Sequence, residues 1–220
     1  NSSLKKTLQF DNKSVIERFF NDFQDGKNDN LISQIKEASL MTISLGLNDF
    51  INPYEYSEKL LQLLHLAKSS IEDFQNEFKD WIQEISAKAK SIERKYNTLI
   101  SEIRKLNKNV NISLIGYISP YVKIAKVIES INADYSIQDI FTVINQTIQN
   151  VAKTNNVNYL NFENQEEVVD KSYELGNSLF DSSLNNSAHK KLAQELFLKL
   201  SLTNEEYDLL VKSKKFNPEH

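Results

Sequence analysis

The stretch Met41–Phe50, which reads Met-Thr-Ile-Ser-Leu-Gly-Leu-Asn-Asp-Phe, constrains the fold more than any other part of the chain. Its apolar run is too short for a typical helix and is rich in β-forming residues, so it predicts a buried strand of a parallel sheet. Gly46 then allows a tight turn, which leaves Asn48 just past the carboxyl end of the strand, where open α/β sheets bind ligands. The competing interpretation is an ordinary turn in which Asn48 or Asp49 caps the next helix.

Two further apolar runs, Val110–Tyr117 and Val157–Phe162, predict two more strands, and helical periodicity fills the intervals between the three. This alternation predicts an α/β sandwich with a parallel sheet. Between the first two strands, residues 55–107 carry an apolar stripe at steps of three and four, which predicts long helices. The pattern favours helices that pack on the sheet; a coiled coil and a helical lid are the alternatives.

Composition excludes several classes of function. The 220 residues, most simply one domain, carry a formal net charge of −4 and no large basic cluster, which argues against nucleic-acid binding. There are no cysteines and three histidines, with no ligand spacing, so we expect no disulfide and no catalytic metal. No glycine-rich phosphate loop is present, and we expect no cofactor. No run approaches the roughly 20 apolar residues of a transmembrane span.

Three features together resemble the SGNH/GDSL family of ester hydrolases: the run Ile-Ser-Leu-Gly-Leu-Asn-Asp-Phe ending at Phe50, the run Ile-Gly-Tyr-Ile-Ser-Pro ending at Pro120, and His189 before an amphipathic helix. The resemblance extends from about Leu31 to Leu200. It implies a three-layer, flavodoxin-like parallel sheet flanked by helices, with residues 55–107 as a long helical insertion. The implied activity is that of a lipase, esterase or carbohydrate esterase on a small-molecule or lipid ester.

The resemblance also assigns roles to individual residues. Asn48 matches the asparagine that donates its side-chain amide to the oxyanion, and Gly46 lies beside it as a further member of the oxyanion hole. His189 matches the general base. The family has an aspartate three residues before this histidine, where this chain has Asn186. We therefore expect the imidazole to be oriented by Asn186 or by Asp181; Glu163 or a backbone carbonyl are further alternatives.

The family's Gly-Asp-Ser-Leu nucleophile motif does not follow any predicted strand. The nearest string, Gly-Asn-Ser-Leu at residues 176–179, makes Ser178 a minor candidate. We expect the nucleophile, the first strands of the sheet and any export signal to lie upstream of Asn1, in an N-terminal segment that completes the sheet. The alternative is a catalytically inactive binding or surface-interaction module of the same fold. By analogy with the family, we expect an extracellular or cell-surface location.

Overall fold

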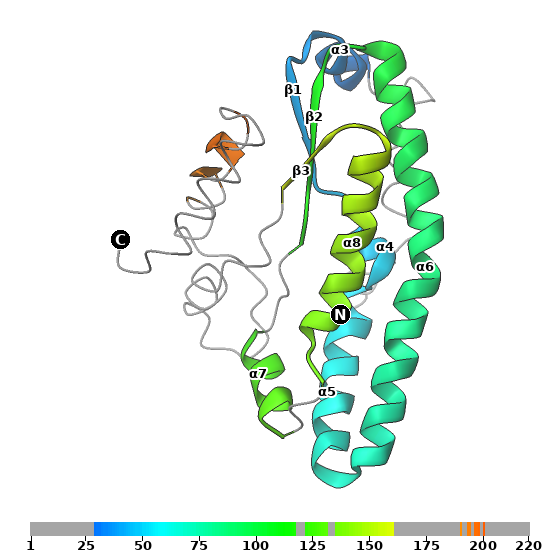
Figure 1. Ribbon diagram of the computed structural model, residues 1–220, viewed down its shortest axis with the longest axis vertical. Coiled ribbons are helices and arrows are strands. Elements are labelled where there is room, and N and C mark those ends of the chain that lie inside the picture. Colours follow the sequence, from blue (N-terminus) through cyan, green and yellow to red (C-terminus); the bar gives the residue numbers. More distant parts are fainter. Residues whose placement is uncertain are drawn as a thin grey trace, which may run out of the picture.

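The computed structural model describes residues 29–117, 122–131 and 135–160, together with residues 190, 193–194, 196–198 and 200 (Figure 1). All statements about structure below concern these residues. Their helices and strands follow one another in the order α3 (Asp29–Glu37), β1 (Leu40–Ile43), α4 (Leu47–Phe50), α5 (Pro53–Ser69), α6 (Ile71–Leu106), β2 (Asn111–Ile115), α7 (Val122–Ile131), α8 (Gln138–Thr154) and β3 (Asn158–Leu160).

The sheet has the strand order β1-β2-β3, and both neighbouring pairs are parallel, as predicted. The register sets Leu40 opposite Asn111 and Ser113 opposite Asn158. Parallel crossovers are right-handed, so strands that follow one another in this order place their connecting helices on the same face. Figure 1 shows this arrangement, with α6 and α8 together on one side of the strands. The α/β architecture with flanking helices is therefore confirmed.

Helix α6 is the longest element, with 36 residues and a length of about 54 Å at roughly 1.5 Å per residue. Ser70 caps its start, since the Ser70 side chain accepts a hydrogen bond from the Asp73 amide, and the helix continues without glycine or proline. Its first half extends beyond the sheet beside α5, and its second half passes the strands (Figure 1). A buried apolar stripe follows its whole length, made of Phe74, Phe78, Trp81, Ile85, Ile92, Tyr96, Leu99, Ile100 and Ile103. This burial confirms the packing role that the periodicity favours.

Three details of the sequence prediction were wrong or incomplete. Helix α7 was not predicted, and Leu45, expected in the first strand, lies beyond its end at Ile43. The strand predicted at Val110–Tyr117 is shorter, as β2, and the strand predicted at Val157–Phe162 begins at Asn158, as β3, while residues 161 and 162 lie outside the described residues. The described residues do not test the second helical layer or the first strands that the family resemblance implies. Within the described part of the chain, no helix is both long and apolar enough to cross a membrane.

Candidate active site

The site begins at the turn between β1 and α4. Gly46 has a φ of 97°, in the left-handed region that residues with a side chain rarely adopt. From this position its carbonyl oxygen accepts hydrogen bonds from the amides of Asp49 at 3.0 Å and Phe50 at 3.2 Å. These bonds close the single turn of α4 immediately after the strand. Glycine is therefore required here by the backbone, as the sequence predicted.

Asn48 lies on this turn with its side chain exposed to solvent. The next residues anchor the turn, because Phe50 is fully buried and Ile51 nearly so. Gly46 is the N-cap of α4 and no side chain caps the helix, so the interpretation of Asn48 or Asp49 as a cap is wrong. The uncharged amide of Asn48 is therefore exposed to solvent at the carboxyl end of β1. The two residues Phe50 and Ile51, which follow the turn, are buried in the core.

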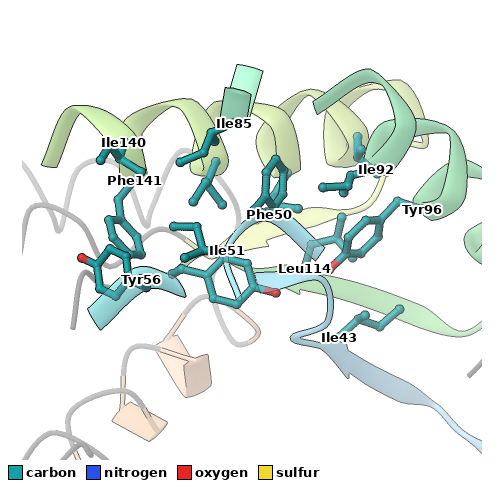
Figure 2. Close-up of a cluster of buried hydrophobic side chains, with 14 of the residues drawn as sticks. Ile43, Phe50, Ile51, Tyr56, Ile85, Ile92, Tyr96, Leu114, Ile140 and Phe141 are labelled. Atoms are coloured by element: carbon teal, nitrogen blue, oxygen red, sulfur yellow. The ribbon is translucent and has the colours of Figure 1, made fainter. Parts of the chain in front are cut away.

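Two tyrosines hold the residue that precedes the glycine. The hydroxyls of Tyr96, on α6, and Tyr117, just after β2, both donate to the carbonyl oxygen of Leu45. The amide of Leu45 in turn donates to the Tyr96 hydroxyl at 3.2 Å. Figure 2 shows Tyr96 reaching from α6 toward the strands, near Leu114 and Ile43. Both polar groups of the Leu45 backbone are therefore occupied, so Leu45 cannot continue the sheet ladder.

Both phenols are neutral hydrogen-bond donors at physiological pH. Burial raises the pKa of Tyr117 to about 12, although hydrogen bonds with Tyr96, the Leu47 backbone and the Ser44 side chain lower it. Burial raises the pKa of Tyr96 still further, and the neighbouring Tyr117 adds to the effect. The Asp49 carboxylate acts in the same direction on both phenols, because a nearby negative charge disfavours a tyrosinate.

Tyr117 is itself fixed through its main chain by Asn145 of α8. The Tyr117 amide donates to Asn145 Oδ1 at 2.7 Å, and Asn145 Nδ2 donates to the Tyr117 carbonyl at 2.8 Å. Only 2% of Asn145 is exposed, so this pair of bonds satisfies polar groups that burial would otherwise penalise. Beside it, the Gly116 amide donates to the Leu160 carbonyl of β3 at 2.8 Å. The carboxyl end of β2 is therefore tied to both α8 and β3.

Helix α6 supports the same turn with two lysines. Lys88 Nζ donates to the Phe50 carbonyl at 3.2 Å, and Lys95 Nζ lies 3.8 Å from Asp49 Oδ1. The Asp49 side chain is only 3% exposed, and neither of its oxygens has a hydrogen-bond donor within the described structure. Lys88, Lys95 and Tyr96 all reach this turn from α6, so a single helix braces the turn that carries Asn48.

Of the site residues predicted from sequence, the structure places Asn48 and Gly46 together at the carboxyl edge of the sheet. His189, Asn186, Asp181 and Ser178 lie outside the described residues, so their positions stay predictions. The described residues contain no group of three or more metal-ligating side chains.

Sequence reasoning did not assign a role to Tyr96, Tyr117 or Asn145. A signal for two of them was present. Tyr117 belongs to the Gly-Tyr strand end that was already noted, and Asn145 interrupts the apolar face formed by Ile144 and Ile148. A polar residue on such a face indicates a buried hydrogen-bonding role. Tyr96 had no comparable signal, because it continues an apolar stripe.

A parallel sheet with helical crossovers, and with a polar turn at the carboxyl end of a strand, defines an α/β protein whose ligand site is expected at that edge. Residues 3–196 match the family described as GDSL-like Lipase/Acylhydrolase, and the chain belongs to this family. The resemblance seen in the sequence is thereby confirmed. Neither a curated protein nor a solved structure matches the chain.

Proposed function

We propose that this protein hydrolyses esters through a serine nucleophile, with Asn48 as oxyanion donor and His189 as general base. Membership of the GDSL-like Lipase/Acylhydrolase family assigns the chain to ester and acyl hydrolysis in general. The particular mechanism and the roles of the residues are the proposal. Its substrate would be a small-molecule or lipid ester. A location outside the cell or at its surface rests on family analogy and stays a prediction.

The observation that carries the proposal is the placement of Asn48. Its amide is exposed on a turn that is fixed by a left-handed glycine, by buried Phe50 and by the tyrosines on Leu45. A donor that is already in place needs no reorganisation when negative charge develops on the substrate oxygen. An amide also carries no charge of its own, so it stabilises the oxyanion across a wide pH range.

In the proposed reaction the serine oxygen attacks the ester carbonyl while His189 accepts the serine proton. The carbonyl electrons move to the oxygen, which becomes the oxyanion that Asn48 stabilises. The tetrahedral intermediate then collapses, the bond to the alcohol breaks, and His189 returns the proton to the leaving alkoxide. Water, activated by the same imidazole, attacks the acyl-enzyme and releases the carboxylic acid and the free serine.

The edge of β1 supports the placement of the nucleophile on a further strand. Within the described residues β1 pairs with β2 alone, and Leu40 on β1 is 43% exposed. An unpaired parallel edge is a template for another strand. We place the nucleophilic serine on a segment upstream of Asn1 that pairs with this edge, which would bring its carboxyl end beside Gly46 and Asn48.

A second candidate is a binding module of the same fold that has lost catalysis. It is favoured by Asn186, which stands where the family has the aspartate that orients the histidine. An uncharged side chain accepts a hydrogen bond from the ring but does not stabilise the imidazolium, and such a change in a serine triad costs about 10⁴ in kcat.

The test uses the complete protein and a short-chain chromogenic ester. Asn48→Ala should lower kcat by about 100- to 1,000-fold with little change in KM, the usual loss for one oxyanion donor. Asn150→Ala is the matched control. Asn150 is exposed on the last turns of α8, toward the amino ends of the strands, so its substitution should leave turnover unchanged. An Asn48→Ala enzyme with full kcat would exclude the proposed role, and a wild-type protein without turnover would favour the binding module.

A further inference from the structure

At the Leu45–Gly46 peptide bond, α6 and the segment just after β2 meet the turn of Asn48. The carbonyl of this peptide accepts two tyrosine hydroxyls, one from Tyr96 and one from Tyr117. In a trans peptide the carbonyl and the following amide lie in one plane and point in opposite directions. Fixing the Leu45 carbonyl therefore fixes the direction of the Gly46 amide and the start of the turn that presents Asn48.

The two hydroxyls also act on the electrons of that peptide. A carbonyl that accepts hydrogen bonds polarises its amide group, and chains of hydrogen bonds strengthen one another in a low-dielectric interior. The amide at Gly46 becomes a better donor as a result. Gly46 is the second predicted member of the oxyanion hole. The two tyrosine hydroxyls therefore influence both predicted oxyanion donors, Asn48 and Gly46.

Of the two tyrosines, Tyr117 is held by a dedicated polar side chain. Asn145 pairs with both the amide and the carbonyl of Tyr117, at 2.7 and 2.8 Å, in a position that is almost fully buried. Ester hydrolysis as proposed gives Asn145 no direct part. A buried asparagine 28 residues from its partner in the sequence is better explained by the need to hold that strand end in one place.

We infer that Tyr117, held by Asn145, is a positioning residue for the oxyanion donor Asn48, acting through the Leu45–Gly46 peptide. The inference rests on the proposed function, since it assigns how the donor of that reaction is kept in place. The chain of contacts runs from α8 through the end of β2 to the turn after β1. Three segments that are distant in sequence therefore determine the position of the turn that carries Asn48. Tyr117 touches the turn and not the reacting atoms.

The first test is kinetic and uses the complete protein. Tyr117→Phe keeps the buried ring and removes only the hydroxyl, so it should lower kcat by about tenfold or more at unchanged KM, the penalty of a slightly misplaced catalytic group. Tyr135→Phe is the control, because Tyr135 packs against Phe74 and Phe78, away from this turn. An unchanged kcat in Tyr117→Phe overturns the inference.

The second step combines Tyr117→Phe with Asn48→Ala. If Tyr117 acts by positioning Asn48, the loss of kcat from Tyr117→Phe should be several-fold smaller when the amide of Asn48 is already absent, because residues in one functional unit are non-additive. A loss that is just as large in both backgrounds would mean that Tyr117 acts elsewhere, and the inference would be overturned.

A third measurement does not depend on turnover. The amides of Asp49 and Phe50 donate to the Gly46 carbonyl, so their hydrogen exchange reports how often the turn opens. Tyr117→Phe should accelerate their exchange by about tenfold relative to wild type, and Tyr135→Phe should not change it. If the protein hydrolyses no ester, the proposed function fails, but faster exchange still supports Tyr117 as the residue that positions the turn. Unchanged exchange overturns the inference in either case.

Discussion

Gly116 is the position at which one added methyl group should disturb the fold and the site together. It lies at the carboxyl end of β2, where its amide donates to the Leu160 carbonyl at 2.8 Å. A Cβ atom at this residue would stand 2.6 Å from the Tyr159 hydroxyl oxygen, 3.1 Å from Asn145 Oδ1 and 3.2 Å from the Leu160 carbonyl oxygen. The substitution Gly116→Ala therefore crowds a side chain, a buried amide and a backbone group at once.

The contact with Tyr159 dominates the cost. To reach an ordinary separation of about 3.4 Å, the hydroxyl must retreat by about 0.8 Å, while the other two atoms need shift only by a few tenths of an ångström. Overpacking of this kind costs typically about 1–3 kcal/mol. For a chain of this length, a loss of about 2 kcal/mol lowers Tm by roughly 4–8 °C.

Urea unfolding measures this loss directly. The chain has a single tryptophan, Trp81, which is only 5% exposed in α6, so its fluorescence reports global unfolding. We would measure Gly116→Ala alone and together with Tyr159→Phe, which removes the atom closest to the new Cβ. The free energy lost through Gly116→Ala should be at least about 1 kcal/mol smaller in the Tyr159→Phe background, the scale of coupling between residues in contact.

Two results would refute this reasoning. If Gly116→Ala left the free energy of unfolding unchanged, the end of β2 would be looser than the contacts imply. If the loss were equal with and without the Tyr159 hydroxyl, the strain would come from the backbone or from Asn145 instead of the predicted contact.

Three further predictions concern the turn and its chemistry. Phe50→Ala should lower the free energy of unfolding by about 3–5 kcal/mol in urea titrations, because Phe50 is fully buried; a loss below about 1 kcal/mol would contradict its role as the anchor of the turn. The folded protein raises the pKa of Tyr117 to about 12 from 10.0, so the unfolded chain ionises first and stability should fall between about pH 10 and 12. The urea midpoint should fall less steeply with pH in Tyr117→Phe, and an identical slope would contradict the shift. His189→Ala should abolish ester turnover in the complete protein, whereas retained turnover would exclude His189 as the base.

Periodicity in the sequence was sufficient to predict most of the fold. The stripe that begins at Phe74 and continues at helical steps predicted α6, and the short apolar runs bounded by glycine and polar residues predicted the three strands. The exception was α7 (Val122–Ile131), which follows closely after Pro120. Pro120 indicates the end of the preceding strand, and no helix was predicted for the short segment that follows it. Local signals locate long elements well and short ones less well.

The site was only partly predictable, because its geometry comes from contacts between residues far apart in the sequence. Glycine before Asn48 correctly indicated the turn, since the left-handed backbone is a local requirement. The end of β1 at Ile43 was missed, because the hydroxyls that hold Leu45 come from residues 51 and 72 positions away. A tyrosine on an apolar stripe gives no local sign of the backbone group that its hydroxyl will reach.

Intact-mass analysis of the complete protein, after treatment with a fluorophosphonate that labels activated serines, tests the proposed serine mechanism itself. We expect one adduct, on a serine upstream of Asn1, and its loss in the His189→Ala variant. An adduct on Ser178 would contradict the placement of the nucleophile. No adduct at all would contradict the serine mechanism and leave the binding module of the same fold as the better description.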